Sequence, residues 1–165
     1  MHIEGSGALV AGGASGLGEA TTRQLHERGA IVTIADVNDE KGNTLADELG
    51  VRFVACDVRE EAQVQAAVEA AAEAEGGLRI SVCCAGVGWA QRTTGSKGPH
   101  PLEPFATIVA INLIGTFNVL RLAATSMRGN DPDEGAERGV CVQTASVAAY
   151  EGQICLLYTS DAADE

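Results

Sequence analysis

A glycine-rich segment at residues 12–18, GGASGLG, is the first part of the sequence whose residue types point to chemistry. An apolar run precedes it and a helical pattern follows it, so it joins a strand to the N-terminus of a helix. Such a terminus offers unpaired backbone amides and the positive end of the helix dipole to phosphate groups. We therefore predict a pyrophosphate-binding turn, in which Gly12 makes the tight turn, Gly16 or its neighbours let the phosphates approach, and Gly18 brings the helix close to the sheet. The alternative is a glycine-rich turn without a ligand.

Asp36 is the second candidate, because it ends a predicted strand about 20 residues after the glycine turn, where dinucleotide folds place a ribose contact. Its carboxylate can accept hydrogen bonds from both ribose hydroxyls, and it would repel a 2′-phosphate. No Arg or Lys stands within the glycine turn to offset that repulsion. We therefore expect NAD rather than NADP as the cofactor. The alternative is a helix-capping aspartate, since Asn38 and Asp39 follow.

Asp57 and the segment 84–86, Cys-Ala-Gly, stand at the carboxyl ends of two further predicted strands. Ligands of open parallel sheets bind at that edge, so we expect both to face one crevice. Asp57 can accept a hydrogen bond from an adenine amino group. It can also cap the helix that begins near Glu60, and the two roles are compatible. Ala85 and Gly86 are small enough for the backbone to touch a cofactor.

An alternation of strands and helices positions these candidates. The predicted strands are residues 8–11, 31–35, 51–55, 80–84 and 140–144, and the predicted helices are residues 17–28, 38–49, 60–75 and 102–127, the last as a short piece and a long one. Residues 87–101 and 129–138 are predicted loops. This order predicts an α/β protein with a doubly wound parallel sheet, the Rossmann fold, covered by helices on both faces.

Composition narrows the classes of function. The chain has 165 residues, enough for one domain, and its formal charge of −12 argues against nucleic-acid binding. We expect no membrane association, because no apolar run approaches the ~20 residues of a membrane helix. We also expect no signal peptide and a cytoplasmic location. Cys83 and Cys84 lie in an apolar run and are interpreted as small buried hydrophobes rather than as metal ligands.

Together these motifs resemble the short-chain dehydrogenase/reductase family, which carries a TGxxxGxG turn, an acidic residue after the second strand, DV after the third strand and NNAG after the fourth. The matching segments here are residues 11–18, Asp36, Asp57-Val58 and residues 83–86, which read CCAG. The family's helix asparagine matches Asn112, and its catalytic serine matches Ser146. The resemblance covers residues 6–154. We interpret residues 1–154 as the NAD-binding part of a single-domain protein, incomplete at its C-terminal side.

Within the family, segments such as NLIGTFNVLRLAA and TASVAAYEGQI look like the type-2 3-hydroxyacyl-CoA dehydrogenases. This resemblance implies oxidation of a 3-hydroxyacyl-CoA to a 3-oxoacyl-CoA by NAD, and a homotetramer for the full-length protein. A hydroxysteroid or another secondary alcohol is the alternative substrate. The residues that it implies in contact with NAD are Ser15, Leu17, Asp36, Asp57, Val58 and Cys84. It also implies that Ser146 contacts the substrate and that Asn112 supports a water chain to a lysine.

The main departure from the family concerns its YxxxK pair. In the family's chemistry a tyrosine acts as the base, and a lysine four residues later lowers the tyrosine pKa from about 10. Tyr158 stands twelve residues after Ser146 where the family has thirteen, the residue four positions later is Ala162, and no lysine follows Lys97. We therefore predict that the 165-residue chain is inactive. A non-catalytic NAD-binding fragment is the alternative function.

Residues 155–165, CLLYTSDAADE, do not resemble the family, which continues with small residues and then YSASK. They look like the in-frame translation of a transposase-type sequencing adapter, so we interpret them as a non-native tail. A genuine divergent C-terminus is the alternative. Sequencing the source DNA after the codon for Ile154 distinguishes the two.

Overall fold

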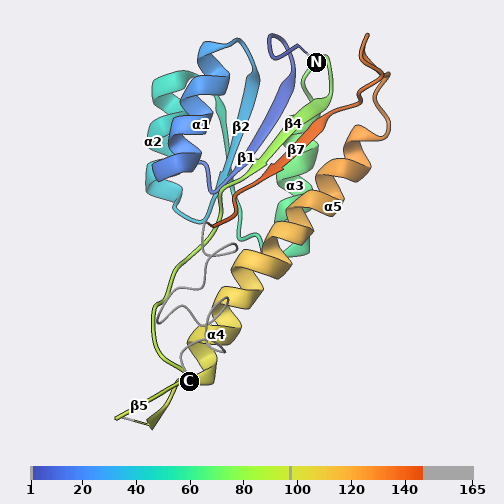
Figure 1. Ribbon diagram of the computed structural model, residues 1–165. Coiled ribbons are helices and arrows are strands. Elements are labelled where there is room, and N and C mark those ends of the chain that lie inside the picture. Colours follow the sequence, from blue (N-terminus) through green and yellow to red (C-terminus); the bar gives the residue numbers. More distant parts are fainter. Residues whose placement is uncertain (1, 97, 147–165) are drawn as a thin grey trace.

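The computed structural model describes residues 2–96 and 98–146, and its centre is a parallel sheet (Figure 1). The strands of this sheet follow the order β3-β2-β1-β4-β7. Their bounds are Gly7–Ala11 for β1, Ile31–Asp36 for β2, Arg52–Ala55 for β3, Leu78–Cys83 for β4 and Val140–Gln143 for β7. The chain builds outward from β1 to β3 and then crosses to the other side of β1 for β4 and β7. The sheet is therefore doubly wound, as predicted, and its ligand crevice is expected where the order reverses.

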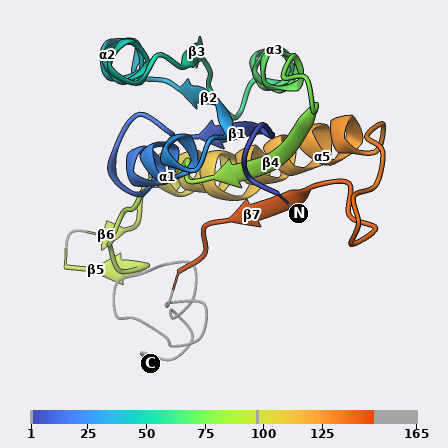
Figure 2. The same ribbon diagram turned by 90° about the horizontal axis from the view of Figure 1, so that it is seen from above.

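Helices cover both faces of the sheet (Figure 2). The bounds are Gly16–Glu27 for α1, Asp39–Leu49 for α2, Glu61–Ala72 for α3 and Thr116–Met127 for α5. Ala8 and Val10 of β1 belong to the core cluster that includes Leu25 of α1, whereas Leu9 and Ala11 belong to the cluster that α3 and α5 cover. Successive side chains of a strand point to opposite faces, so the apolar run of β1 supplies a core to both layers.

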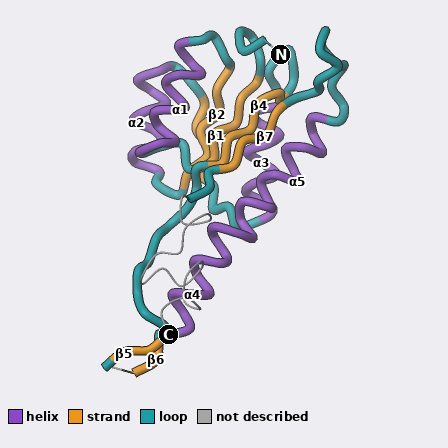
Figure 3. Tube along the Cα trace, viewed as in Figure 1, coloured by secondary structure: helices purple, strands orange, loops and turns teal. Residues whose placement is uncertain are grey.

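Most boundaries lie within two residues of the sequence-based expectation, and three segments differ more clearly (Figure 3). Helix α3 ends at Ala72, because the chain then turns, with the Gly77 amide donating to the Ala74 carbonyl at 2.7 Å. The predicted loop 87–101 contains a short antiparallel pair, β5 (Thr94–Gly95) and β6 (Gly98–Pro99). The predicted helix 102–127 is continuous but changes its winding: α4 spans Leu102–Ile108, a π-helical segment spans Val109–Gly115, and α5 follows.

The long helix Leu102–Met127 is strongly apolar. Its mean hydropathy reaches 1.6 over a window of which 22% is buried, so by length and composition alone it could cross a membrane. The core helices of soluble proteins meet the same criterion. Its large exposed side chains are Leu102, Leu113, Ile114 and Phe117. The expectation of no membrane association therefore stays a prediction.

Candidate functional site

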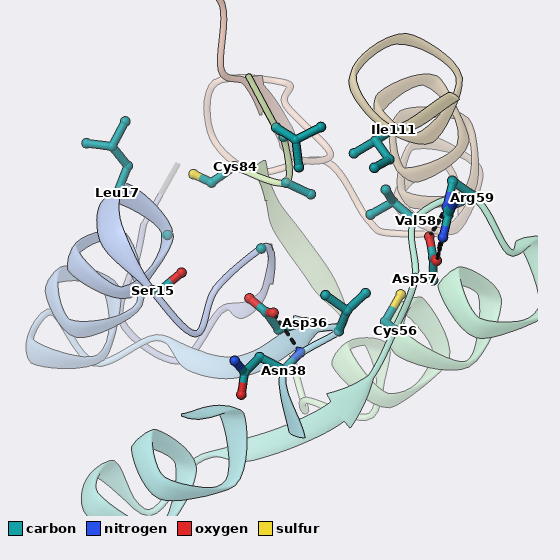
Figure 4. Close-up of a pocket in the computed structure, with 16 residues that line it drawn as sticks. Ser15, Leu17, Asp36, Asn38, Cys56, Asp57, Val58, Arg59, Cys84 and Ile111 are labelled. Atoms are coloured by element: carbon teal, nitrogen blue, oxygen red, sulfur yellow. Dashed lines mark hydrogen bonds and ion pairs between the residues drawn. The ribbon is translucent and has the colours of Figure 1, made fainter. Parts of the chain in front are cut away.

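A cleft of about 630 Å³ opens where β1, β2, β3 and β4 end (Figure 4). It is lined by most of the residues predicted to bind the cofactor, namely Gly12, Ser15, Leu17, Gly18, Asp36, Asp57, Val58, Cys84, Ala85 and Gly86. Sequence reasoning did not single out the remaining lining residues, which are Val37, Asn38, Cys56, Arg59, Val87 and Ile111. The predicted Gly16, Asn112 and Ser146 are not among the lining residues. The carboxyl edge of the sheet therefore brings together groups that lie up to 99 positions apart in the sequence, from Gly12 to Ile111.

The glycine turn packs tightly at both of its ends. A Cβ on Gly18 would stand 1.9 Å from the Gly12 carbonyl oxygen, and a Cβ on Gly12 would stand 2.5 Å from the Ala85 backbone nitrogen. No side chain fits at either position without moving backbone. These glycines let the start of α1 and the end of β4 come together at the floor of the cleft, which is the role predicted for Gly18.

The N-terminus of α1 opens into the cleft without a side-chain cap. Ser15 is the N-cap residue and lines the cleft, and its hydroxyl makes no capping hydrogen bond. Apart from Gly16, its two chain neighbours and the nearby backbone of α1, no heavy atom of the described residues lies within 4 Å of the point where a Cβ on Gly16 would stand. The acidic Glu19 in the first turn is paired with Arg23 at 3.0 Å. The first amides of a helix lack intrahelical partners, so this donor set and the open space before it fit a pyrophosphate.

Asp36 stands beside that turn, and each of its oxygens holds one backbone amide. Oδ2 accepts from the Ala14 amide at 3.0 Å, and Oδ1 accepts from the Asn38 amide at 3.0 Å. The N-cap of α2 is Asn38, whose side chain accepts from the Lys41 amide. Asp36 is therefore not the cap of α2. It fixes the glycine turn against the end of β2 while its carboxylate lines the cleft.

Asp57 is bound by Arg59, two residues later in the same loop. Oδ1 accepts from the backbone nitrogen and Nε of Arg59, both at 3.0 Å, and Oδ2 accepts from Nε at 3.0 Å and Nη2 at 2.5 Å. This guanidinium holds the pKa of Asp57 below its usual value. The N-cap of α3 is Glu60, so the Asp57 carboxylate does not cap that helix. Its partner in the cleft is Arg59, which sequence reasoning missed.

The loop that carries Asp57 is anchored from α5. Asn118 is buried, and its Nδ2 donates to the Val58 carbonyl at 2.9 Å while its Oδ1 accepts from Arg121. A Cβ on Gly115 would stand 2.5 Å from the Val58 side chain, so only glycine lets the helix come so near. Asn118 was not predicted, although a polar residue inside an apolar helix is a signal that could have found it.

A sequence model of the family described as short chain dehydrogenase matches residues 6–160. The chain belongs to the short-chain dehydrogenase family. Dehydrogenases of this family generally depend on NAD(H) and act on small molecules, which agrees with a cleft built around a glycine turn and an acidic strand end.

Individual relatives are similar over most of the chain. The 3-hydroxyacyl-CoA dehydrogenase type-2 of Drosophila melanogaster is 47% identical over 156 residues, which cover 92% of this chain and 61% of that protein. The ipsdienol dehydrogenase of Ips pini is 38% identical over 153 residues, which cover 91% of this chain and 60% of that protein. The crystal structure of 3-hydroxyacyl-CoA dehydrogenase type-2 from Mycobacterium avium has a TM-score of 0.87 and 47% identity, covering 92% and 61%. The chain spans about three fifths of the length of these relatives.

The two residues that match the family's catalytic motif lie outside the cleft lining. Asn112, in the π-helical segment, accepts from the Val87 amide at 2.9 Å and donates to the Val87 carbonyl at 2.8 Å. It therefore fixes the backbone just after Gly86. Ser146 is exposed and follows β7 by three residues. Tyr158, Ala162 and the segment 155–165 lie outside the described residues.

The cysteines near the cleft differ in burial. Cys83 is buried, as predicted, but Cys84 is only partly buried and lines the cleft, so its reading as a buried hydrophobe is wrong. Cys56 is buried beneath the cleft, and burial, followed by the charge of Asp57, raises the pKa of its thiol to about 11. Such a thiol is protonated at neutral pH.

In residues 2–96 and 98–146 no group of three His, Cys, Asp or Glu side chains is placed to hold a metal ion.

Proposed function

We propose that the cleft binds NAD and that the full-length protein uses it to oxidise a secondary alcohol, with a 3-hydroxyacyl-CoA as the substrate. The observation that carries the proposal is that the uncapped N-terminus of α1 and the carboxylate of Asp36, at the end of β2, line the same cleft. The names of the Drosophila and Mycobacterium relatives support the substrate.

The described residues offer partners for the pyrophosphate and for the adenosine ribose of NAD. The first-turn amides of α1 would hold the pyrophosphate, and Asp36 would hold the adenosine ribose. Each Asp36 oxygen has one hydrogen bond from the protein, so each keeps acceptor capacity for one ribose hydroxyl. A 2′-phosphate would meet this carboxylate instead. Arg23, the nearest cation on α1, is already held by Glu19 and Glu48, so NAD is preferred over NADP.

Bound NAD would supply the carbon that accepts a hydride from the alcohol. Among the described residues, Asn112 fixes the strand-end backbone at Val87 beside the cleft. Ser146 carries a hydroxyl that would contact the substrate oxygen. The resemblance assigns the proton to a tyrosine with a lysine partner. Because no lysine follows Lys97, NAD binding without turnover is the second candidate for the 165-residue chain.

One relative supports an alternative substrate class. The ipsdienol dehydrogenase of Ips pini, by its name, acts on ipsdienol rather than on an acyl-CoA. A hydroxysteroid, as the sequence resemblance allows, or another secondary alcohol is the alternative substrate for the full-length protein.

Isothermal titration calorimetry of the 165-residue chain with NAD and NADP tests the binding half of the proposal. We expect NAD to bind and NADP to bind at least about 10-fold more weakly, the equivalent of one lost or repelled contact. Equal affinity for both, or no binding of either, contradicts the proposal.

The catalytic half of the proposal is tested on the protein that the source DNA encodes when it is read past the codon for Ile154. The assay measures the formation of reduced nicotinamide by this continued product. We expect turnover with a 3-hydroxyacyl-CoA in the continued product and none in the 165-residue chain. A preference of the continued product for ipsdienol or a hydroxysteroid would select the competing substrate class.

A further inference from the structure

A second cavity, of about 360 Å³, lies between α1 and α2 and adjoins the proposed ribose site. Asn38 lines both this α1–α2 groove and the cleft, and its amide donates to Asp36 (Figure 4). Ala14, whose amide also donates to Asp36, lines the groove as well. Both residues that hold the proposed ribose acceptor thus form part of the groove. A 2′-phosphate on a ribose bound by Asp36 would stand at the entrance of this groove.

Charged side chains line the α1–α2 groove from both helices. Helix α1 contributes Glu19 and Arg23, and α2 contributes Glu40, Lys41 and Glu48. The carboxylates outnumber the cations, so the groove as it stands disfavours a phosphate. It nevertheless contains an arginine, the side chain whose planar fork of N–H donors matches a phosphate.

Two carboxylates hold this arginine. Nε and Nη2 of Arg23 donate to Oε1 of Glu19, each at 3.0 Å. Nη1 donates to Oε1 of Glu48 at 2.6 Å, and Nη2 donates to Oε2 of Glu48 at 2.8 Å. Four of the five N–H groups that a guanidinium carries are therefore in use.

The pairing leaves Arg23 charged and accessible but without donors for a ligand. The bonds to Glu48 and then to Glu19 raise the pKa of Arg23, and Arg23 in turn holds the pKa of Glu48 below its usual value. The Arg23 side chain is 35% exposed, so a ligand can reach it. The carboxylates, and not burial, are thus what withholds the guanidinium from a phosphate.

We infer that Glu19 and Glu48 determine the preference for NAD over NADP, because they hold Arg23 and thereby close a phosphate subsite in the α1–α2 groove. The inference rests on the proposed binding of NAD and adds two positioning residues to Asp36. Neither glutamate lines the cleft, so neither has to touch the bound dinucleotide.

The experiment measures the dissociation constants of NAD and NADP by calorimetry on the 165-residue chain and compares their ratio between variants. Glu19→Ala combined with Glu48→Ala releases the guanidinium, which can then donate to the 2′-phosphate. The preference for NAD should fall by about 10-fold, the change expected for one hydrogen bond between charged groups. Adding Arg23→Ala to this double variant should bring the ratio back to within about threefold of the wild type.

Glu40→Ala is the matched control, because it removes a carboxylate from the same groove and leaves the partners of Arg23 in place. The control and the triple variant gain the same net charge. Through water, that charge alone should change the ratio by only about twofold. Lys41 is present in every variant, so its attraction for a phosphate does not distinguish them.

Two results overturn the inference. One is a double variant that keeps the wild-type ratio, and the other is a triple variant that keeps the gain in relative NADP affinity. A wild type that binds neither dinucleotide refutes the proposed function itself, whatever the variants do.

Discussion

Asp36 and Asp57 are the same residue type at comparable places, close to the carboxyl ends of neighbouring strands, yet their surroundings differ. Asp36 receives one backbone amide on each oxygen, from Ala14 and from Asn38. Within the described residues, the Asp57 carboxylate accepts hydrogen bonds only from Arg59. The Asp36 carboxylate is held by backbone amides, whereas the Asp57 carboxylate is held chiefly by the charged side chain of a neighbour.

The comparison separates two properties of a binding residue. Position at the end of a parallel strand places a side chain in the cleft. The partners of that side chain then decide whether it remains an acceptor for a ligand. The glycine turn reaches Asp36 with a backbone amide and leaves its acceptor capacity half used, whereas three N–H groups of Arg59 take up most of the capacity of Asp57.

The largest effect is expected for Asp36→Ala. It removes the proposed ribose acceptors and leaves the Ala14 amide without its partner, so NAD affinity should fall by about 100-fold and the free energy of unfolding by about 1–3 kcal/mol. Calorimetry measures the NAD affinity, and urea denaturation measures the free energy of unfolding. Asp47→Ala, at an exposed site on α2, is the control and should change neither affinity nor stability by more than about 0.5 kcal/mol. If Asp36→Ala loses no more NAD affinity than the control, the Asp36 carboxylate does not bind NAD, and the proposed difference between Asp36 and Asp57 is wrong.

A smaller loss of NAD affinity is expected for Asn118→Leu, which detaches the Asp57 loop from α5. The Val58 carbonyl loses its donor and Arg121 loses one of its acceptors while it keeps Glu61, so the free energy of unfolding should fall by about 1–3 kcal/mol. NAD affinity should fall less than in Asp36→Ala, because no proposed ligand contact is removed. Thr125→Ala, an exposed site on the same helix, is the control for urea denaturation. Unchanged stability in Asn118→Leu would mean that the loop is held without this anchor.

The smallest effect is expected for Arg59→Ala on stability. The ion pair is partly exposed, so its loss should lower the free energy of unfolding at neutral pH less than either substitution above. The pKa of Asp57 is lowered in the folded protein, chiefly by its side-chain hydrogen bond with Arg59. The contribution is therefore present above the unfolded pKa of about 3.9 and lost as pH falls through the lower folded value.

Urea denaturation of the wild type and Arg59→Ala across this acidic range checks the sign. The difference in unfolding free energy should shrink toward zero with decreasing pH. A difference that grows as the solution becomes more acidic would contradict the assignment of Asp57 as the partner of Arg59.

Local sequence patterns were sufficient for the sheet and for most of the cleft. The alternation of apolar strands with amphipathic helices depends on residue spacing within each element, and the strand ends followed from it. The glycine turn was predicted because glycine is needed wherever backbone approaches backbone, as at Gly18. Asp36 was predicted because the end of the next strand lies at a known spacing from that turn.

Only the tertiary structure decided which polar groups remain open to a ligand. Asn118 meets Val58 across 60 positions, and Asn112 meets Val87 across 25, so no local pattern specifies either bond. Arg59 is near Asp57 in the sequence, but its rotamer depends on the loop that α5 and Gln63 hold in place. The sequence by itself determined where the cleft lies, because strand ends are set by local periodicity. The folded chain decided what the cleft can bind, because acceptor capacity depends on long-range packing and on side-chain conformation.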